Sequence, residues 1–221
     1  WSSDVCSSDL DVFSTTRSSA DKKKAEYGLA LSLQESGLLY SASKYYSIIV
    51  RRGRSKSNPY FRNAMEALGN INSTLSLGRS HIVKLFKTKI RLSDVPGSSR
   101  GFYFYYKGVE AFEKSSFKIA SKFFDKVPSS SDYYYNSLFH RGVIANISGN
   151  HSRSIAYFEK VIAGTKGKTN SSEVNEMSIM NIARVYYERK DFTKAISYYG
   201  RIPRNSVNWL DALWESSWAF F

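Results

Sequence analysis

Apolar positions in the second half of the chain recur with a period of about 34 residues. Each copy has a small residue in one amphipathic segment and a large aromatic residue near the end of the next. Gly108 and Phe124 in the first copy are followed one period later by Gly142 and Phe158. The copies are FYFYYKGVEAFEKSSFKIASKFFDKVP (102–128), NSLFHRGVIANISGNHSRSIAYFEKVI (136–162), EMSIMNIARVYYERKDFTKAISYYGRIP (176–203) and the start of a fourth, NWLDALWESSWAFF (208–221). The spacing predicts pairs of helices joined by short turns.

Each residue type in the pattern has a physical reason to be there. A small residue in the first helix and an alanine in the second, such as Ala120 or Ala195, let the two helices approach closely. Proline, as at Pro128 and Pro203, ends the second helix because it lacks a backbone N–H. Two weaker copies precede residue 101. The aromatic residues expected to fill the gaps between pairs are Tyr46, Phe86, Phe124, Phe158 and Tyr199.

This pattern resembles the tetratricopeptide repeat (TPR), a helix–turn–helix unit of about 34 residues. The resemblance implies an all-α fold, an α-solenoid of TPR-like repeats, here truncated at both ends. We expect two degenerate TPR-like hairpins in residues 21–100, and three TPRs plus the first helix of another in residues 101–221. Trp214, Trp218 and Phe220 form an apolar series in that last helix, which would need a further helix to bury it.

The first ten residues, WSSDVCSSDL, differ in character from the rest of the chain. They match the in-frame translation of a short-read sequencing adapter, and they lack the basic start and apolar run of a signal peptide. We therefore interpret residues 1–10 as adapter-derived and expect residues 11–20 to be a disordered or frayed start. Cys6, the single cysteine, then belongs to the adapter, and neither a disulfide nor a cysteine metal site is expected.

The positive charge is concentrated in one segment. The 221 residues carry a formal net charge of +13. The segment from Lys44 to Arg100 contains twelve Lys and Arg residues but only two acidic residues, Glu66 and Asp94, so its local charge is +10. Apolar residues make up 42% of the chain, as in globular proteins, but no apolar run is long enough to cross a membrane. The charge pattern therefore indicates a local electrostatic field within a globular chain.

The sequence shows no catalytic constellation. His81, His140 and His151 are isolated from one another, and no phosphate-binding loop, nucleophile elbow or metalloprotease motif occurs. We expect no catalytic residues, no cofactor and no metal site, and we predict that the chain is not an enzyme.

A TPR array binds peptides or partner helices in the concave groove that its first helices line. We therefore expect a protein or peptide partner and a non-catalytic scaffold function. Aromatic, Met and Arg residues are typical of such interfaces, and Arg184 could pair with a carboxylate of the partner. The predicted groove residues are Tyr105, Val109, Phe112, Phe139, Val143, Asn146, Met180, Arg184, Tyr187, Trp214 and Trp218.

The basic segment 44–100 offers an alternative function, the binding of nucleic acid or anionic lipid. In SHIVKLFKTKIR three cations share one helical face, and the apolar residues Ile82, Leu85, Phe86 and Ile90 supply the other face. A solvated helix face beside a basic loop explains the same pattern, so this alternative ranks second. The predicted basic patch consists of Arg51, Arg52, Arg54, Lys56, Lys84, Lys87 and Arg91.

Residues 101–221 also resemble the repeats of bacterial envelope TPR proteins, of the TolA-binding and outer-membrane assembly lipoprotein types. The resemblance rests on repeat motifs that many TPR proteins share, such as the junction YYGRIPRNSVNWLDALWESSWAFF. It implies a periplasmic or outer-membrane-associated location and does not identify a partner.

Overall fold

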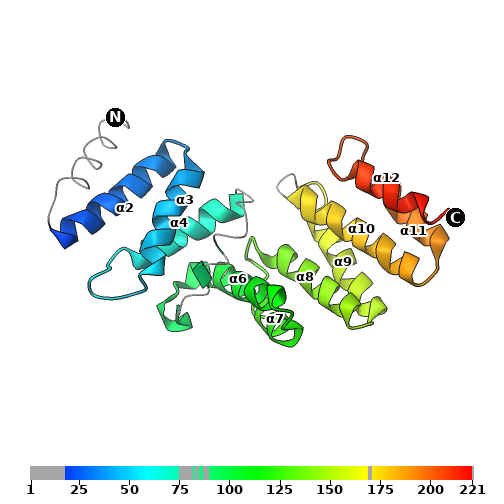
Figure 1. The fold of residues 1–221 in the computed structure, drawn as a ribbon, viewed down its shortest axis with the longest axis horizontal. Coiled ribbons are helices and arrows are strands. Elements are labelled where there is room, and N and C mark those ends of the chain that lie inside the picture. The colour runs from blue at the N-terminus through cyan, green and yellow to red at the C-terminus, as the bar shows by residue number, and fades with distance from the viewer. Residues whose placement is uncertain (1–17, 75–81, 83–84, 87–89, 169–170, 221) are drawn as a thin grey trace. The chain divides into compact units, whose positions relative to one another are not determined.

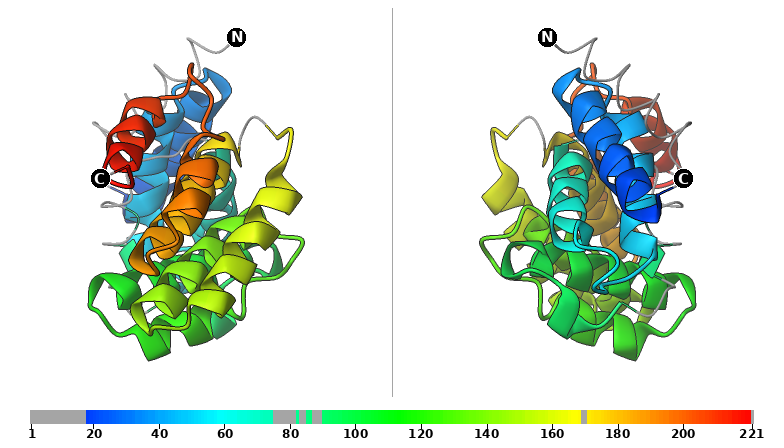
Figure 2. Two further views of the ribbon diagram at one scale, coloured as in Figure 1. Left: turned by 90° about the vertical axis from the view of Figure 1, so that its right-hand side faces the viewer. Right: turned by 90° about the vertical axis from the view of Figure 1, so that its left-hand side faces the viewer.

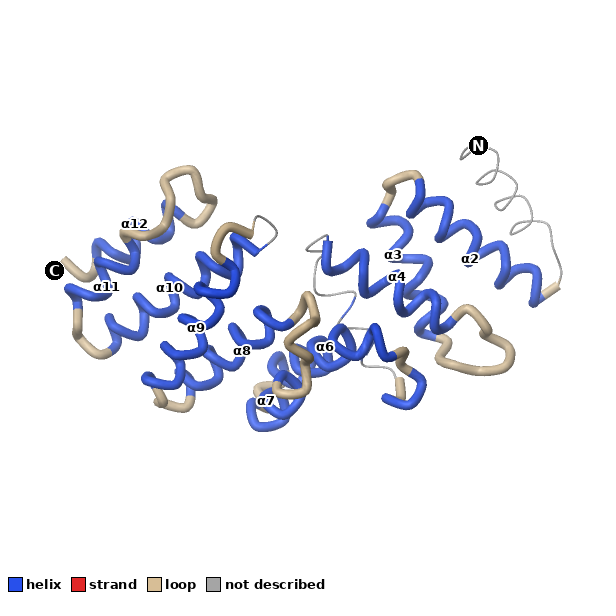
Figure 3. The backbone as a smooth tube through the Cα atoms, turned by 180° about the vertical axis from the view of Figure 1, so that it is seen from behind, coloured by secondary structure: helices blue, strands red, loops and turns tan. Residues whose placement is uncertain are grey.

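All regular secondary structure in the described part of the chain is helical, as the computed structural model shows (Figures 1 and 3). The residues described are 18–74, 82, 85, 86, 90–168 and 171–220. The chain divides into two compact units, unit 1 (Trp1–Ser115) and unit 2 (Ser116–Phe221). The boundary falls between the two helices that the sequence pattern assigns to the first TPR of residues 101–221.

In its described residues, unit 1 contains a helical hairpin, a third helix, two short 3-10 turns and a further long helix, α6. Its elements are α2 (Ser19–Glu35), α3 (Leu39–Arg51), α4 (Phe61–Thr74), η1 (Leu92–Asp94), η2 (Gly97–Ser99) and α6 (Arg100–Glu113). Helix α3 packs against both α2 and α4, which face the reader in the right panel of Figure 2. Helix α2 is capped by the Ser18 hydroxyl, so it begins inside the range 11–20 that we expected to be frayed. The predicted adapter segment 1–10 lies outside the described residues.

Unit 2 is a run of antiparallel helices in which each packs against the next. Its elements are α7 (Phe117–Phe124), α8 (Tyr134–Ile147), α9 (His151–Thr165), α10 (Ser172–Glu188), α11 (Phe192–Tyr199) and α12 (Trp209–Ser217). Helix α10 also contacts α8, so the first helices of successive hairpins lie side by side (Figure 1). The fold is therefore the all-α, TPR-like helical repeat that the spacing predicted, with α8, α10 and α12 as first helices and α9 and α11 as second helices.

The two hairpin turns of unit 2 have the same backbone geometry. Gly149, at the α8–α9 turn, and Lys190, at the α10–α11 turn, both have positive φ, of 73° and 60°. The next residues, Asn150 and Asp191, cap the following helices, because each side chain accepts a backbone N–H from three residues further on, at 3.1 and 3.3 Å. The repeat is thus reproduced in its turns although the turn sequences differ.

The aromatic residues predicted to fill the gaps between helix pairs are buried, as the repeat pattern predicted. Their exposed fractions are 0% for Tyr46, Phe86 and Phe158, 1% for Phe124 and 5% for Tyr199. The second-helix alanines Ala42, Ala120 and Ala195 are completely buried as well.

Gly142 shows why a small residue is needed in the first helix. A Cβ atom built on this glycine would lie only 2.6 Å from the ring of Phe158 in α9. The Phe158 side chain has no exposed surface, so its ring has little room to move away. The absence of a side chain at Gly142 therefore sets how closely α8 and α9 pack.

Replacing Gly142 by alanine should lower the free energy of unfolding by about 1–3 kcal/mol, because overpacking forces the Phe158 ring or the helix axis to shift. Urea unfolding of Gly142→Ala measures this loss. Gly97→Ala is the matched control, since a Cβ there would have no neighbour within 4 Å, and it should be neutral or slightly stabilising. Equal stability of Gly142→Ala and the unaltered chain would contradict the packing account.

Candidate partner-binding surface

An ion pair joins the first helices α10 and α12. Arg184 in α10 donates from Nε and Nη2 to the two carboxylate oxygens of Glu215 in α12, at 2.8 and 2.6 Å. The hydroxyl of Tyr199 in α11 donates to the same carboxylate at 2.9 Å. Three helices are therefore held in register by one carboxylate.

The pKa shifts of these groups reflect the shared contact. The hydrogen bonds that Arg184 donates to Glu215 raise the pKa of Arg184, although burial has the opposite effect. Burial alone would raise the pKa of Glu215, but the hydrogen bonds and charge of Arg184, with the Tyr199 hydroxyl, outweigh it and lower the pKa. Burial and the bond to Glu215 together raise the pKa of Tyr199. The sequence suggested that Arg184 could receive a partner's carboxylate, whereas the structure gives it one from within the chain.

A second polar contact joins α8 to α10. The amide nitrogen of Asn146 in α8 donates to both oxygens of Glu188 in α10, at 3.1 and 3.3 Å. The Asn146 oxygen lies 2.9 Å from Nδ1 of His151, the first residue of α9. Asn146 therefore lies at the junction of two successive hairpins, where part of its hydrogen-bonding capacity is already used.

The outer side of α12 carries a concentrated apolar surface. Trp214 is 66% exposed and Trp218 is 55% exposed, and their rings pack edge to face with centroids 5.8 Å apart. The residues around them that are also more than half exposed are Val207, Leu210, Leu213 and Phe220. We call Leu210, Leu213, Trp214 and Trp218 the α12 face. A concentration of exposed large apolar residues such as this is uncommon on the surface of a soluble monomer.

The remaining predicted groove residues lie in different environments. Tyr105 and Val109 in α6 and Met180 in α10 are 3%, 2% and 1% exposed, so these three form part of the core and present almost no surface to a partner. Phe112, Phe139 and Val143 are half-buried, and the Phe139 ring packs 5.6 Å from that of Phe158. Tyr187 is 37% exposed. The residues of α6 belong to unit 1, so the surface that the structure brings together comes from α8, α10 and α12.

Two members of the α12 face, Leu210 and Leu213, were missed in the sequence. The signal was present, because these residues share the helical spacing of Trp214 and Trp218.

The basic loop between α3 and α4 is held in a defined shape. Asn58, which is only 3% exposed, donates from its amide nitrogen to the carbonyls of Ile49 and Gly53, at 2.9 and 2.8 Å. Two of its cations are engaged, Arg52 by Glu26 and Arg54 by Asp94. Arg51, Lys56 and Arg91 are exposed, whereas Lys84 and Lys87 lie outside the described residues. The apolar side of the predicted basic helix, Ile82, Leu85, Phe86 and Ile90, is buried as expected.

The described residues offer neither a metal site nor a membrane-spanning helix. In that part of the chain, no three His, Cys, Asp or Glu side chains gather closely enough to hold a metal ion. Of the helices that the structure describes, none combines the length and the apolar character that a bilayer crossing requires. His140 is 4% exposed, and its Nδ1 lies 2.9 Å from the Asn136 carbonyl one helical turn earlier.

Glu215→Gln should lower the free energy of unfolding at neutral pH by about 1 kcal/mol, because the charge-assisted bonds to Arg184 are weakened. The pKa of Glu215 is lower in the folded chain than its ordinary value of 4.5. The contribution of the ionised Glu215 to the free energy of unfolding is therefore complete above pH 4.5, and it disappears as the pH falls through the lowered pKa. The free energies of unfolding of the two proteins, measured in urea, should converge in acid. The control Glu113→Gln, at an exposed position, should change the free energy of unfolding little at any pH. A difference that persists undiminished in acid would contradict the ion-pair account.

Comparison with known proteins gives one kind of match. No family model matches the chain. No curated protein matches it at a significant level. Among solved structures, the chain is similar to the crystal structure of MamA, with a TM-score of 0.48 and 15% sequence identity over 87% of this chain and 98% of the MamA chain.

Proposed function

We propose that this chain is a protein-interaction scaffold and that it binds a helix or peptide of a partner protein against the α12 face. The observation that carries the proposal is the exposure of Trp214 and Trp218, at 66% and 55%, on a helix that the core holds in place. Tryptophan is the residue most enriched among those that dominate binding energy at protein interfaces.

The repeat itself indicates what kind of partner fits. Trp214 and Trp218 stand one repeat period after Met180 and Arg184. In α10 these two positions face the following helices, because Met180 belongs to the core cluster that includes Ala212 of α12, and Arg184 bonds to Glu215. Among the described residues, no helix covers the corresponding positions of α12. A helix packed on α12 as α12 packs on α10 would bury them.

The surface is also anchored to the neighbouring helices of unit 2. Ala212 of α12 packs in the same cluster as Ala195 and Tyr199 of α11, and Glu215 bonds to two neighbouring helices. Because α12 is already fixed, binding requires little ordering of the backbone, and less of the interaction energy is lost to entropy. We propose that Tyr187 of α10 and the half-buried Phe139, Val143 and Asn146 of α8 extend the surface along the first helices.

The alternative, binding of nucleic acid or anionic lipid to the basic segment, has less support. Arg52 and Arg54 are paired within the chain, which reduces the charge that the loop offers to an anion. The α12 face therefore remains the stronger candidate.

We further propose a location in the bacterial cell envelope, at the periplasm or the outer membrane. This proposal rests on the resemblance of residues 101–221 to envelope TPR proteins. Resequencing the gene across both ends of the chain tests it. A signal peptide or lipid-anchored cysteine upstream is expected, and a cytoplasmic start would contradict the proposal.

Peptides selected from a random library for binding to the full chain should lose at least about tenfold in affinity for the Trp214→Ser/Trp218→Ser variant. Fluorescence polarisation of the labelled peptides measures this. Both side chains are largely exposed, so the variant should remain folded, which thermal unfolding checks. Ile119→Ser, at a residue 53% exposed on α7, is the control and should bind normally. Selected peptides that bind the double variant as tightly as the unaltered chain would rule out the α12 face.

A further inference from the structure

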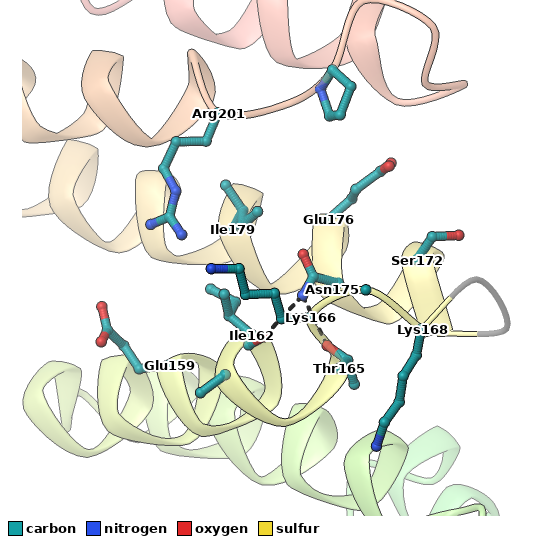
Figure 4. A pocket seen from close by; sticks show the side chains of 13 residues that line it. Glu159, Ile162, Thr165, Lys166, Lys168, Ser172, Asn175, Glu176, Ile179 and Arg201 are labelled. Atoms are coloured by element: carbon teal, nitrogen blue, oxygen red, sulfur yellow. Dashed lines mark hydrogen bonds between the residues drawn. The ribbon is translucent and has the colours of Figure 1, made fainter.

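A cavity of about 690 Å³ lies where α9 ends and α10 begins, beside the segment that follows α11 (Figure 4). Its volume falls within the range of sites that hold small ligands or single peptide side chains. Its lining residues come from the end of α9, the loop after it, the start of α10 and the segment after α11, and none of them belongs to the α12 face. The cavity is therefore separate from the α12 face.

The floor of the cavity is aliphatic and fixed. Ile162 and Ala163 of α9 and Ile179 of α10 line it, and Ile179 is also part of the buried core of unit 2. The Asn175 amide nitrogen donates to the Ile162 carbonyl at 3.1 Å and to the Thr165 hydroxyl at 2.8 Å, which ties α10 to the end of α9 (Figure 4). An apolar side chain would therefore meet a preformed surface.

Both carboxylates in the wall are already hydrogen-bonded. Glu159 accepts from the Tyr198 hydroxyl at 2.7 Å. Glu176 accepts from the amide nitrogen of Asn208 at 2.8 Å and from the hydroxyl of Ser206, which anchors the segment before α12. These donors are neutral, so both carboxylates help to hold the wall together and keep their negative charge.

The cations in the wall have no such partners. Among the described residues, no carboxylate pairs with Lys166, Lys168 or Arg201. The Arg201 guanidinium lies over the Tyr198 ring at 4.9 Å, and Lys168 lies over the Tyr135 ring. Figure 4 shows Arg201 and Lys166 reaching over the aliphatic floor from different sides, while Lys168 points away from it. The charged side chains of the wall are Lys166, Lys168, Arg201, Glu159 and Glu176, so their formal charges sum to +1. The two cations above the apolar floor form no ion pair within the described residues.

We propose that this cavity binds a short acidic peptide segment, in which an aliphatic side chain packs on Ile162 and Ile179 and an adjacent carboxylate pairs with Lys166 and Arg201. The charge of the two cations selects the acidic residue, and the floor selects a leucine-sized neighbour. Because both cations are exposed, the ion pairs are screened by salt and the affinity of a single short segment is modest. This second site goes beyond the partner surface proposed for α12 and does not depend on it.

The test uses the full chain with isotope-labelled isoleucine methyl groups and the blocked peptide acetyl-Ala-Leu-Glu-Glu-Ala-amide. Saturable shifts of the Ile162 and Ile179 methyl signals are expected, with a dissociation constant on the order of 1 mM. Replacing both glutamates of the peptide by glutamine should weaken binding at least about fivefold, and added salt should weaken it as well. No shift of either methyl signal at about ten times that concentration, or equal binding of the glutamine peptide, would overturn the proposal.

Variants of the chain locate the site. Lys166→Glu/Arg201→Glu should weaken binding at least about tenfold, because two attractive contacts become repulsive. Lys118→Glu/Lys122→Glu on α7 makes the same change of net charge at exposed positions outside the cavity and should leave binding almost unchanged. Equal losses in both variants would show a general charge effect and contradict the proposed site. The Trp214→Ser/Trp218→Ser variant should bind this peptide normally, so failure of one surface is distinguishable from failure of the other.

Discussion

The close approach of α8 and α9 at Gly142 is the contact on which the arrangement of unit 2 depends. The Phe158 ring occupies the space that a side chain at position 142 would fill, and it has no exposed surface. With the aromatic residues of the second helices buried between neighbouring helices, each hairpin packs against the next. The first helices α8, α10 and α12 then lie side by side, which brings residues far apart in the sequence onto one surface.

Polar contacts between the first helices complete this arrangement. Asn146 reaches Glu188 across the α8–α10 junction, and Arg184 reaches Glu215 across the α10–α12 junction. These groups fix the helices relative to one another, so the surface formed by α12 is preorganised. The α12 face differs from the corresponding surface of α10 in one respect, since no helix in the described part of the chain covers it. This apolar face, uncovered among the described residues, is the surface on which we propose that a helical partner docks.

The sequence predicts the fold of unit 2 well because each helical hairpin is determined by the residue types and spacing within one repeat. Repeat spacing alone predicts that Phe158 and Tyr199 lie in the core and that Gly142 lies at a close helix contact, and both predictions are confirmed. The site was harder to predict. From the sequence, Arg184 is predicted to be an unpaired cation in the groove. In the structure it pairs with Glu215, 31 residues further on, and repeat spacing alone does not predict this pair. Met180 fits an interface by composition, but its burial depends on the packing of α11 and α12.

The most direct test of the account is amide hydrogen exchange of the full chain with and without a bound library-selected peptide. The account predicts that the peptide slows exchange in α12 (Trp209–Ser217) and near the end of α10, where Arg184 and Tyr187 lie. Exchange in α9 should stay unchanged, because its aromatic residue is already buried in the core. Slowed exchange confined to α9, or to unit 1, with none in α12, would contradict the claim that the first helices present the binding surface.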